Sequence, residues 1–310
     1  MHAVLITAYK DYPSLLRLVR RLDRGFFKPF IHIDRRSRIG EAEIDELQTL
    51  GAEVSKRFVI RWGSHAHLQA ILHLTAQALE HGGFDYIHLI SGQDYPLWTA
   101  DGFEERCDGR IFIDHVPLEE EPRFVRERYE LGDPFHFLLT GPRGVDPVHK
   151  FLFRKSRWIH RLSGGRRKRF GRYDSICKAL VWSSFPASAA KRLMDDPISK
   201  EFLESIRNTR VAEEIYFATY FLNSDLAGSV VKDDLRYTDW RERNGSKPAY
   251  LDESDVDAVL ESGALFARKV SSTVSAKLLD AIDAARFKPC GFALPLIYLS
   301  RNRELEPFEA

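Results

Sequence analysis

Two adjacent acids, Glu213 and Glu214, begin the most apolar predicted helix of the chain, which runs to about Asn223. Acidic side chains in a first turn complement the helix dipole, and this alone accounts for their presence. The same field keeps a carboxylate ionised, so that it can accept a proton at neutral pH. The residues alone leave both interpretations open.

Two adjacent cations, Arg268 and Lys269, follow the apolar pair Phe266-Ala267. A guanidinium can fork onto a diphosphate, and an ammonium adds a point charge, so the pair could neutralise a leaving diphosphate without a metal ion. Taken alone, an Arg-Lys pair is more often a solvated surface feature.

Metal-binding patterns are weak. The single DxD pattern is Asp255-Val256-Asp257, at a predicted helix start with Ser254 as its cap, where first-turn acids are expected. His65 and His67 are two residues apart, a spacing that does not place both on one helical face. We therefore expect no metal site.

Several common catalytic motifs are missing from the sequence. The first predicted strand is followed by Ala8-Tyr9-Lys10-Asp11 and not by a GxGxxG loop, and the chain has no P-loop, GxSxG or HExxH pattern. Nicotinamide, ATPase and serine-hydrolase functions are therefore disfavoured.

The elements that must position these residues alternate between strand and helix, which predicts βαβ units and a mostly parallel sheet flanked by helices, an α/β class. Apolar runs predict strands at Ala3 to Ala8, Phe30 to Asp34, Ala52 to Ser55, Phe84 to Ile90, Arg110 to Val116 and Ala179 to Trp182. Helical patterns lie at Leu15 to Leu22, Glu41 to Leu50, Ser64 to His81, Pro186 to Met194, Val211 to Asn223 and Ser275 to Ala285.

Ligands of parallel sheets bind beyond the carboxyl ends of the strands. Polar residues follow three of the predicted strands, at Thr7, at Asp34 to Arg36, and at Ser91 to Asp94. We expect a binding site where these strand ends meet.

Residues 1–310 are predicted to form a single domain with a basic excursion at about 150–173 and a C-terminal helical extension at about 275–310. From Lys150 to Arg172 the chain has ten Lys or Arg and no acid, together with Trp158. This stretch could touch an anionic lipid surface or a polyanionic acceptor. A solvated loop is the simpler interpretation.

The chain has 310 residues and a net charge of +1, which argues against a general polyanion binder, and it has no recognisable DNA-reading motif. Its three cysteines, Cys107, Cys177 and Cys290, are far apart and odd in number, which fits a reducing compartment. No signal peptide or membrane span is visible, so we expect a cytoplasmic protein, with contact at the inner membrane face left open.

Six stretches together, in this order, resemble the core-2/I-branching β-1,6-N-acetylglucosaminyltransferases and the related peptide O-xylosyltransferases. They span about residues 2 to 270. They are His32-Ile33-Asp34-Arg35-Arg36-Ser37, Trp62-Gly63, the run from Phe84 to Leu97, Glu213-Glu214-Ile215-Tyr216-Phe217-Ala218-Thr219, Leu235-Arg236-Tyr237-Thr238-Asp239-Trp240, and Phe266-Ala267-Arg268-Lys269. The resemblance implies a GT-A-type nucleotide-sugar fold, a UDP-sugar donor, inversion at the sugar carbon and no metal. The animal enzymes are cysteine-rich and membrane-anchored, so this chain resembles a bacterial-type cytoplasmic relative.

The resemblance also implies roles for the acidic pair and the strand ends. The general base of the family falls on Glu214, although Val211-Ala212 departs from the family's lead-in, so that Glu213 remains a lesser candidate. Asp94 and Glu213 are expected to orient the acceptor or the donor sugar. Thr7 is expected among the donor-binding residues.

Further donor contacts are implied by the remaining motifs. Asp34 and Arg36 correspond to the pair that holds uracil, and Trp62 and Gly63 lie by the nucleotide sugar. Arg268 and Lys269 correspond to the diphosphate grip, while Lys247 is a weak substitute for a second arginine of the branching enzymes. GlcNAc and xylose both remain open as the sugar, and the acceptor, a carbohydrate or glycolipid, is not defined.

Two other functions remain as alternatives. A non-catalytic nucleotide-sugar sensor or a subunit of a polysaccharide pathway would bind UDP without releasing it from a donor. An α/β hydrolase would need the nucleophile elbow that the sequence lacks.

Overall fold

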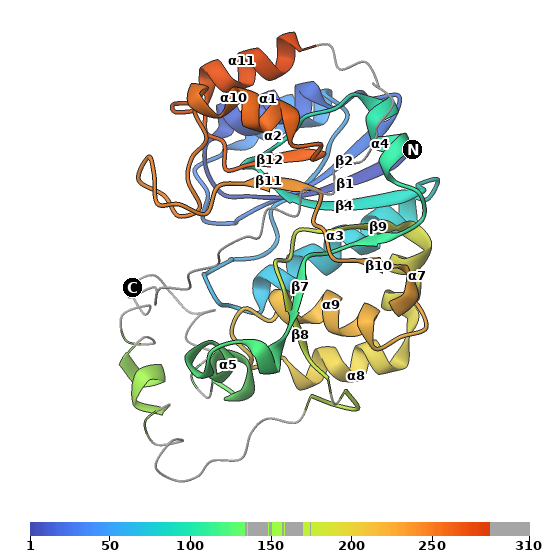
Figure 1. Cartoon of the computed structure of the whole chain (residues 1–310), viewed down its shortest axis with the longest axis vertical. Coiled ribbons are helices and arrows are strands. Elements are labelled where there is room, and N and C mark those ends of the chain that lie inside the picture. Colours follow the sequence, from blue (N-terminus) through green and yellow to red (C-terminus); the bar gives the residue numbers. More distant parts are fainter. Residues whose placement is uncertain are drawn as a thin grey trace.

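A seven-stranded sheet forms the centre of the computed structural model, which describes residues 1–133, 135, 148, 151–156, 158, 170–173 and 175–285. Its strand order is β10-β6-β9-β4-β1-β2-β3 (Figure 1). The strands are β1 (His2–Ala8), β2 (Phe27–Ile33), β3 (Glu53–Ser55), β4 (Tyr86–Ser91), β6 (Ile111–Phe112), β9 (Ser184–Pro186) and β10 (Val230–Val231). All pairings are parallel except the two that β9 makes with β4 and β6. The predicted α/β class with a mostly parallel sheet is confirmed.

The two central strands are buried on both faces, which explains their near-continuous apolar sequences. Every residue of β1 and of β4 is buried. The parallel register pairs Thr7 with both His32 and Ser91. The carboxyl ends of β1, β2 and β4 therefore meet, as the sequence predicts.

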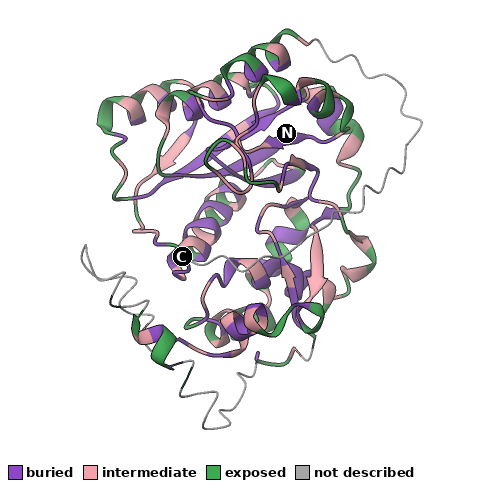
Figure 2. Cartoon of the chain, turned by 60° about the vertical axis from the view of Figure 1, so that its left-hand side comes forward, coloured by how far each residue is buried: buried purple, intermediate pink, exposed green. Residues whose placement is uncertain are grey.

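Helices cover both faces of the sheet (Figure 1). One face carries α1 (Tyr12–Arg21), α2 (Glu41–Thr49), α10 (Val256–Glu261) and α11 (Ala276–Ala284). The other carries α3 (Ala66–His81), α7 (Ala187–Asp195), α8 (Pro197–Ser205) and α9 (Glu213–Leu222). Each set buries its apolar stripe in its own core, and Figure 2 shows the buried strands between helices whose outer faces are exposed.

A small three-stranded sheet, in the order β11-β12-β5, carries the second half of the predicted site. Its strands are β5 (Asp94–Pro96), β11 (Arg236–Thr238) and β12 (Phe266–Arg268). The antiparallel register of β12 with β5 sets Arg268 opposite Asp94. Residues far apart in the sequence are thereby brought into contact.

The remaining elements connect these layers. They are α4 (Ala100–Arg106), β7 (His115–Pro117), the 3-10 turn η1 (Leu118–Glu120), α5 (Arg123–Glu130), β8 (Cys177–Ala179), η3 (Ala227–Ser229) and η4 (Glu253–Asp255). Strands β7 and β8 pair with each other in a separate antiparallel ribbon.

Two predicted strands are wrong in their extent. The stretch from Arg110 to Val116 is not one strand, because the chain leaves the central sheet after β6 and joins β8 as β7. The strand predicted from Ala179 to Trp182 is also wrong, because β8 ends at Ala179 and β9 begins at Ser184. Trp182 lies in the connection, where its ring is free to face the site.

The two predicted appendages differ in how much of each is described. Helix α11 buries Leu278, Leu279 and Ile282 in the core that also holds α1. Residues 286–310 of the predicted extension, and most of the basic excursion, lie outside the described residues.

Neither disulfides nor membrane spans are found in the described part of the chain. Cys107 and Cys177 are free thiols there, and Cys290 lies outside it. Among the described helices, none combines the length and apolar character needed to cross a membrane.

Buried histidines make stability depend on pH. Burial lowers the pKa of His2 and of His32 to about 4, and also lowers that of His88 well below its usual value. Nε2 of His32 accepts a hydrogen bond from the Phe58 amide at 3.0 Å. Unfolded histidine has a pKa of ~6.5, so the unfolded chain takes up protons first as the pH falls. The free energy of unfolding must therefore fall from about pH 6.5 downward, until the folded pKa is reached.

We expect each such histidine to cost ~2 kcal/mol of stability at pH 5 relative to pH 7.5. In His32→Gln, the amide oxygen keeps an acceptor for Phe58 but does not titrate. Denaturant unfolding gives the free energy of unfolding at pH 7.5 and at pH 5. The decrease between these pH values should be smaller in the variant than in the unsubstituted protein by ~2 kcal/mol. Equal falls in both proteins would contradict this account.

Candidate active site

The strand ends form one polar floor. The Gly92 amide donates to the Thr7 carbonyl at 3.0 Å, and the Asp34 amide donates to the Ala8 carbonyl at 2.8 Å. The loops after β1, β2 and β4 are thus tied together. Thr7, Asp34 and the 91–94 turn lie where the sequence predicts a ligand site.

A buried ion cluster stands behind this floor. Asp94 is 0% exposed and accepts from Arg236 Nε at 2.7 Å and from Arg268 Nη1 at 2.9 Å. Its second oxygen also accepts from the amide and the hydroxyl of Ser91, at 2.7 and 2.6 Å. Burial alone would raise the pKa of Asp94, but Arg268 and Arg236 hold it below its usual value. Asp94 thus pairs with two guanidinium groups, and the buried Asp234 carboxylate accepts from the Arg236 amide at 3.2 Å.

The contacts of Asp94, which was predicted to orient a sugar or acceptor, are all with groups of the chain itself. Its oxygens are already occupied by groups of the chain, and its side chain is closed to solvent. The geometry makes Asp94 the residue that fixes Arg268, with Arg236 as the balancing cation. Arg236 was not predicted to have a role, although it belongs to the quoted Leu-Arg-Tyr-Thr-Asp-Trp motif.

Beside Arg268 lies a group of cations with few acids. Lys269 Nζ donates to Ser246 Oγ at 3.2 Å, and Lys10 Nζ donates to the Tyr250 hydroxyl at 3.1 Å. Both ammonium groups lie over the Tyr250 ring, at 5.9 and 5.8 Å from its centroid. Burial, with the charges of Arg268 and Lys10, lowers the pKa of Lys269 to about 8. This positive charge fits a dianionic ligand such as a diphosphate.

The sequence analysis treated three residues in or next to this group, Lys10, Tyr250 and Lys247, in different ways. Lys10 was not predicted to have a role, although a lysine two residues after the end of the first strand was a usable signal. Tyr250 carried no such signal. Lys247 follows Ser246, the contact of Lys269, and so lies one residue from the group.

Glu213 is joined to the strand ends by His67. The Nδ1 atom of His67 lies 2.9 Å from Glu213 Oε1, and its Nε2 atom lies 3.3 Å from Thr7 Oγ1. Glu213 is only 6% exposed, and its Oε2 atom has no hydrogen-bond partner among the described residues. His67 thus connects β1 with the start of α9.

Glu214 points to the other side of the α9 N-terminus. Its Oε2 atom accepts a hydrogen bond from the Tyr129 hydroxyl of α5. Burial raises the pKa of Glu214, although nearby Lys178 and the Tyr129 hydroxyl oppose that rise. Unlike Glu213, Glu214 is partly exposed. It is therefore the more accessible of the two carboxylates for a substrate hydroxyl.

Trp182 connects the two halves of the site. The Arg268 guanidinium lies 4.6 Å from the centroid of the Trp182 ring, and the centroid of the His67 ring lies 6.2 Å from it. Because His67 contacts Glu213, Trp182 is linked to Arg268 directly and to Glu213 through His67. The structure thus links Arg268 of the cation pair to Glu213 of the acidic pair, while Glu214 contacts Tyr129.

The remaining predicted donor residues form a rim next to β2 and α3. Arg36 Nη2 donates to Asp34 Oδ2 at 3.3 Å, and the Ile60 amide donates to the same oxygen at 3.2 Å. The ring of Trp62 is 65% exposed. Asp34 and Arg36, the residues predicted to hold uracil, are therefore in contact with each other. Asp34 also contacts Ile60, which lies two residues before Trp62 in the chain.

Gly63 is required for the packing of this rim. Its φ is +79°, and a Cβ there would lie 3.0 Å from Arg210 Nε. The Arg210 guanidinium lies 4.7 Å from the centroid of the Trp62 ring. The absence of a side chain at Gly63 thus allows Arg210 to pack against the Trp62 ring.

The DxD acids do not join this site. Asp255 pairs with Arg243 and accepts from the Asp252 amide at 2.8 Å. This confirms the interpretation of Asp255 as a residue of a helix start. The cap is Asp252, however, and not the predicted Ser254. Asp252 accepts from the Ser254 amide, which leaves Ser254 as a first-turn residue.

A separate group of metal-type ligands lies at the opposite end of β1. The ligand atoms of His2, His88 and Cys107 lie within 4.8 Å of one another. His2 Nδ1 and His88 Nε2 are 3.0 Å apart and satisfy each other as a hydrogen-bonded pair. Since His2 and Thr7 are five residues apart on one strand, this group is ~17 Å from the strand-end site.

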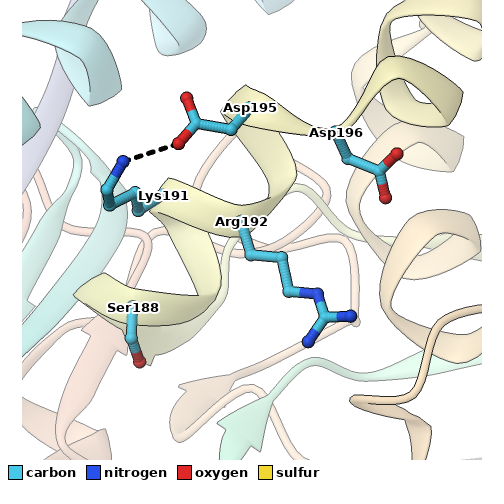
Figure 3. A pocket seen from close by; sticks show the side chains of 5 residues that line it. All are labelled: Ser188, Lys191, Arg192, Asp195 and Asp196. Atoms are coloured by element: carbon cyan, nitrogen blue, oxygen red, sulfur yellow. Dashed lines mark hydrogen bonds and ion pairs between the residues drawn. The ribbon is translucent and has the colours of Figure 1, made fainter.

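A surface hollow on α7 is also distinct from the site (Figure 3). It is lined by Ser188, Lys191, Arg192, Asp195 and Asp196, and an ion pair of 2.6 Å joins Lys191 to Asp195. No residue with a predicted role lines it.

The fold and the site define an α/β protein with a cation-rich anion site at its strand ends and an acidic pair beside it. Residues 3–138 match the family model described as "Branch: Core-2/I-Branching enzyme", a range that holds the first three of the six stretches quoted for the resemblance. Xylosyltransferase 2 of Canis lupus familiaris is 24% identical over 306 residues, covering 89% of this chain and 32% of that protein. Xylosyltransferase oxt of Drosophila melanogaster is 23% identical over 252 residues, covering 76% and 26%.

The chain spans about a third of the length of the first of these curated relatives. Among solved structures, the apo form of mouse xyloside xylosyltransferase 1 aligns with a TM-score of 0.36 and 9% identity. That alignment covers 86% of this chain and 97% of the mouse chain.

Proposed function

We propose that this chain is a GT-A-type glycosyltransferase that moves GlcNAc or xylose from a UDP-sugar to an acceptor hydroxyl, with inversion and without a metal ion. The pathway would be the synthesis of a bacterial polysaccharide or glycoconjugate. One observation carries the proposal: Trp182 contacts Arg268 of the cation group and, through His67, is linked to Glu213, the neighbour of Glu214 at the start of α9.

In the proposed reaction, Glu214 removes the proton from the acceptor hydroxyl. The hydroxyl oxygen forms a bond to the anomeric carbon on the face opposite UDP. The bond from that carbon to the diphosphate oxygen breaks, and its electron pair stays on UDP. Tyr129 holds one oxygen of Glu214 in place, so that the partly exposed carboxylate keeps its orientation.

The departing UDP gains negative charge. The positive charges of Arg268, Lys269 and Lys10 would stabilise it. Arg268 is fixed by Asp94 and Ser91 before the substrate arrives, so little reorganisation is needed. These cations would supply the charge that a divalent ion supplies elsewhere. Asp255, an acid of the DxD pattern that could otherwise bind a divalent ion, forms an ion pair with Arg243.

The family match and the names of the relatives support the donor class. The curated relatives are named xylosyltransferases, which makes UDP-xylose the first donor to test and UDP-GlcNAc the second. A cytoplasmic location is part of the same proposal, because UDP-sugars would have to reach the strand-end site.

The test is a UDP-release screen across UDP-sugars, with a panel of saccharide acceptors, with and without EDTA. We expect release above background with UDP-xylose or UDP-GlcNAc, unchanged by the chelator. Activity lost in EDTA and restored by Mn²⁺ would overturn metal independence. UDP binding without release for any donor and acceptor would favour the nucleotide-sugar sensor.

A further inference from the structure

An exposed apolar stripe runs along one face of a helical segment near the site. Val148, residues 151–156 and Trp158 are helical, and the segment is drawn in light green at the edge of the molecule in Figure 1. Val148, Phe151 and Trp158 are 51%, 58% and 61% exposed. Phe151 and Lys155, four residues apart in the described helix 151–156, lie on the same helical face, and Val148 and Trp158 are helical residues before and after that run.

The opposite face fixes this helix to the protein. Phe153 is buried, and the Arg210 guanidinium lies 4.7 Å from its ring centroid. The same guanidinium lies 4.7 Å from the Trp62 ring, so Phe153 and Trp62 share one contact residue. The helix that carries the exposed stripe is therefore linked to the Trp62 rim of the candidate active site through Phe153 and Arg210.

Apolar exposure is concentrated here. Seven large apolar side chains are exposed in the part of the chain that the structure describes, and four of them are Val148, Phe151, Trp158 and Trp62. Leaving such side chains in water forfeits their burial energy, ~1.5–3 kcal/mol each. Three of them, Val148, Phe151 and Trp158, belong to this helical segment, and such a group points to a surface that is covered when the protein works.

Positive charge surrounds the stripe. Arg154 and Lys155 are exposed, and Lys155 Nζ lies 5.7 Å over the Phe151 ring. In the sequence, residues 150–172 hold ten Lys or Arg and no Asp or Glu, although the whole chain has a net charge of only +1. The surface thus combines exposed aromatic rings with local positive charge.

We propose that this face, Val148, Phe151, Arg154, Lys155 and Trp158, docks the protein peripherally on an anionic lipid surface. Aromatic rings bounded by lysine and arginine are the composition of helices that lie in the membrane interface. A second copy of the chain fits less well, because two such faces would bring like charges together. A polyanion would engage the cations and leave the aromatic rings unused.

Docking would also place the active site. Because the helix is joined to Trp62 through Phe153 and Arg210, docking of its exposed face would hold the rim of the site at a fixed position relative to the membrane. An acceptor carried on a lipid is then the class that this arrangement reaches. This last step rests on the proposed transferase function, whereas the docking itself does not.

The test is co-sedimentation of the full chain with phosphatidylcholine vesicles that either contain or lack about one quarter phosphatidylglycerol. We expect binding to the anionic vesicles at low salt, weakened at ~0.5 M NaCl. The double variant Phe151→Glu, Trp158→Glu should reduce the bound fraction at least ~10-fold, since each ring loses its buried area and gains a repelled charge. Ile198→Glu is the matched control, an exposed apolar residue of α8 that is 37% exposed.

UDP binding by thermal shift is measured on the same proteins. It should be unchanged in the double variant, so that a failed docking test is separated from a failed donor site. Absent binding to anionic vesicles, or an equal loss in the Ile198→Glu control, would overturn the proposal. A dimer that dissociates only in the double variant would assign the face to a second copy, and heparin binding lost in that variant would assign it to a polyanion.

Discussion

Glu214→Gln should lower turnover by ~10²–10⁴-fold while the affinity for UDP stays unchanged. The substitution keeps the size of the side chain and an oxygen that can accept from the Tyr129 hydroxyl. It removes the group that would take the acceptor proton, which is needed only in the transfer step. Steady-state turnover and UDP thermal shift on the same protein separate the two effects.

The pH dependence gives this prediction a second readout. Since burial raises the pKa of Glu214, the base becomes protonated at a higher pH than an ordinary glutamate would. The value of kcat/KM should therefore fall on the acid side as the pH drops through that raised pKa. The residual activity of Glu214→Gln should lack this fall, because its amide does not titrate.

Glu213→Gln is the matched control at the neighbouring position. Glu213 is closed to solvent and bonded to His67, so we expect it to align α9 with the strand ends and not to accept the proton. Its variant should raise KM more than it lowers kcat. Near-normal turnover in Glu214→Gln, with a large loss in Glu213→Gln, would transfer the role of base to Glu213.

The sequence predicts the central sheet well because a buried parallel strand can be recognised from the apolar residues of the strand itself. The runs at β1, β2 and β4 are apolar over nearly their whole length and end in polar residues, so both their type and their ligand-facing ends follow from the pattern. Thr7, Asp34 and the 91–94 turn could be placed in this way.

Contacts made by residues distant in sequence could not be predicted in this way. The register of β12 with β5 is a tertiary property, and it decides that Asp94 holds Arg268 instead of facing a ligand. Trp182 was assigned to a strand because it follows an apolar run, whereas it lies in a connection and joins the two halves of the site. His67 was weighed only as a metal ligand beside His65, while its contacts are with Thr7 and Glu213.

The charge of Lys269 should set the alkaline limit of the reaction. Its pKa is lowered to about 8 by burial and by the charges of Arg268 and Lys10. The ammonium is charged below this pKa and neutral above it, so donor capture must decline as the pH rises through about 8. The value of kcat/KM reports the free enzyme, and it should show this decline.

Lys269→Arg should move the alkaline decline to higher pH, because a guanidinium stays charged throughout that range. Lys269→Ala should weaken UDP binding by about 10- to 100-fold, the loss expected for one charge-assisted hydrogen bond. It should also slow turnover, since the missing charge would have met the developing diphosphate. Lys277→Arg is the control, because Lys277 is an exposed lysine paired with Glu253 and should leave the profile as it is. An alkaline decline that stays near pH 8 in Lys269→Arg would show that another group titrates there, and an undiminished UDP affinity in Lys269→Ala would remove this lysine from the diphosphate site.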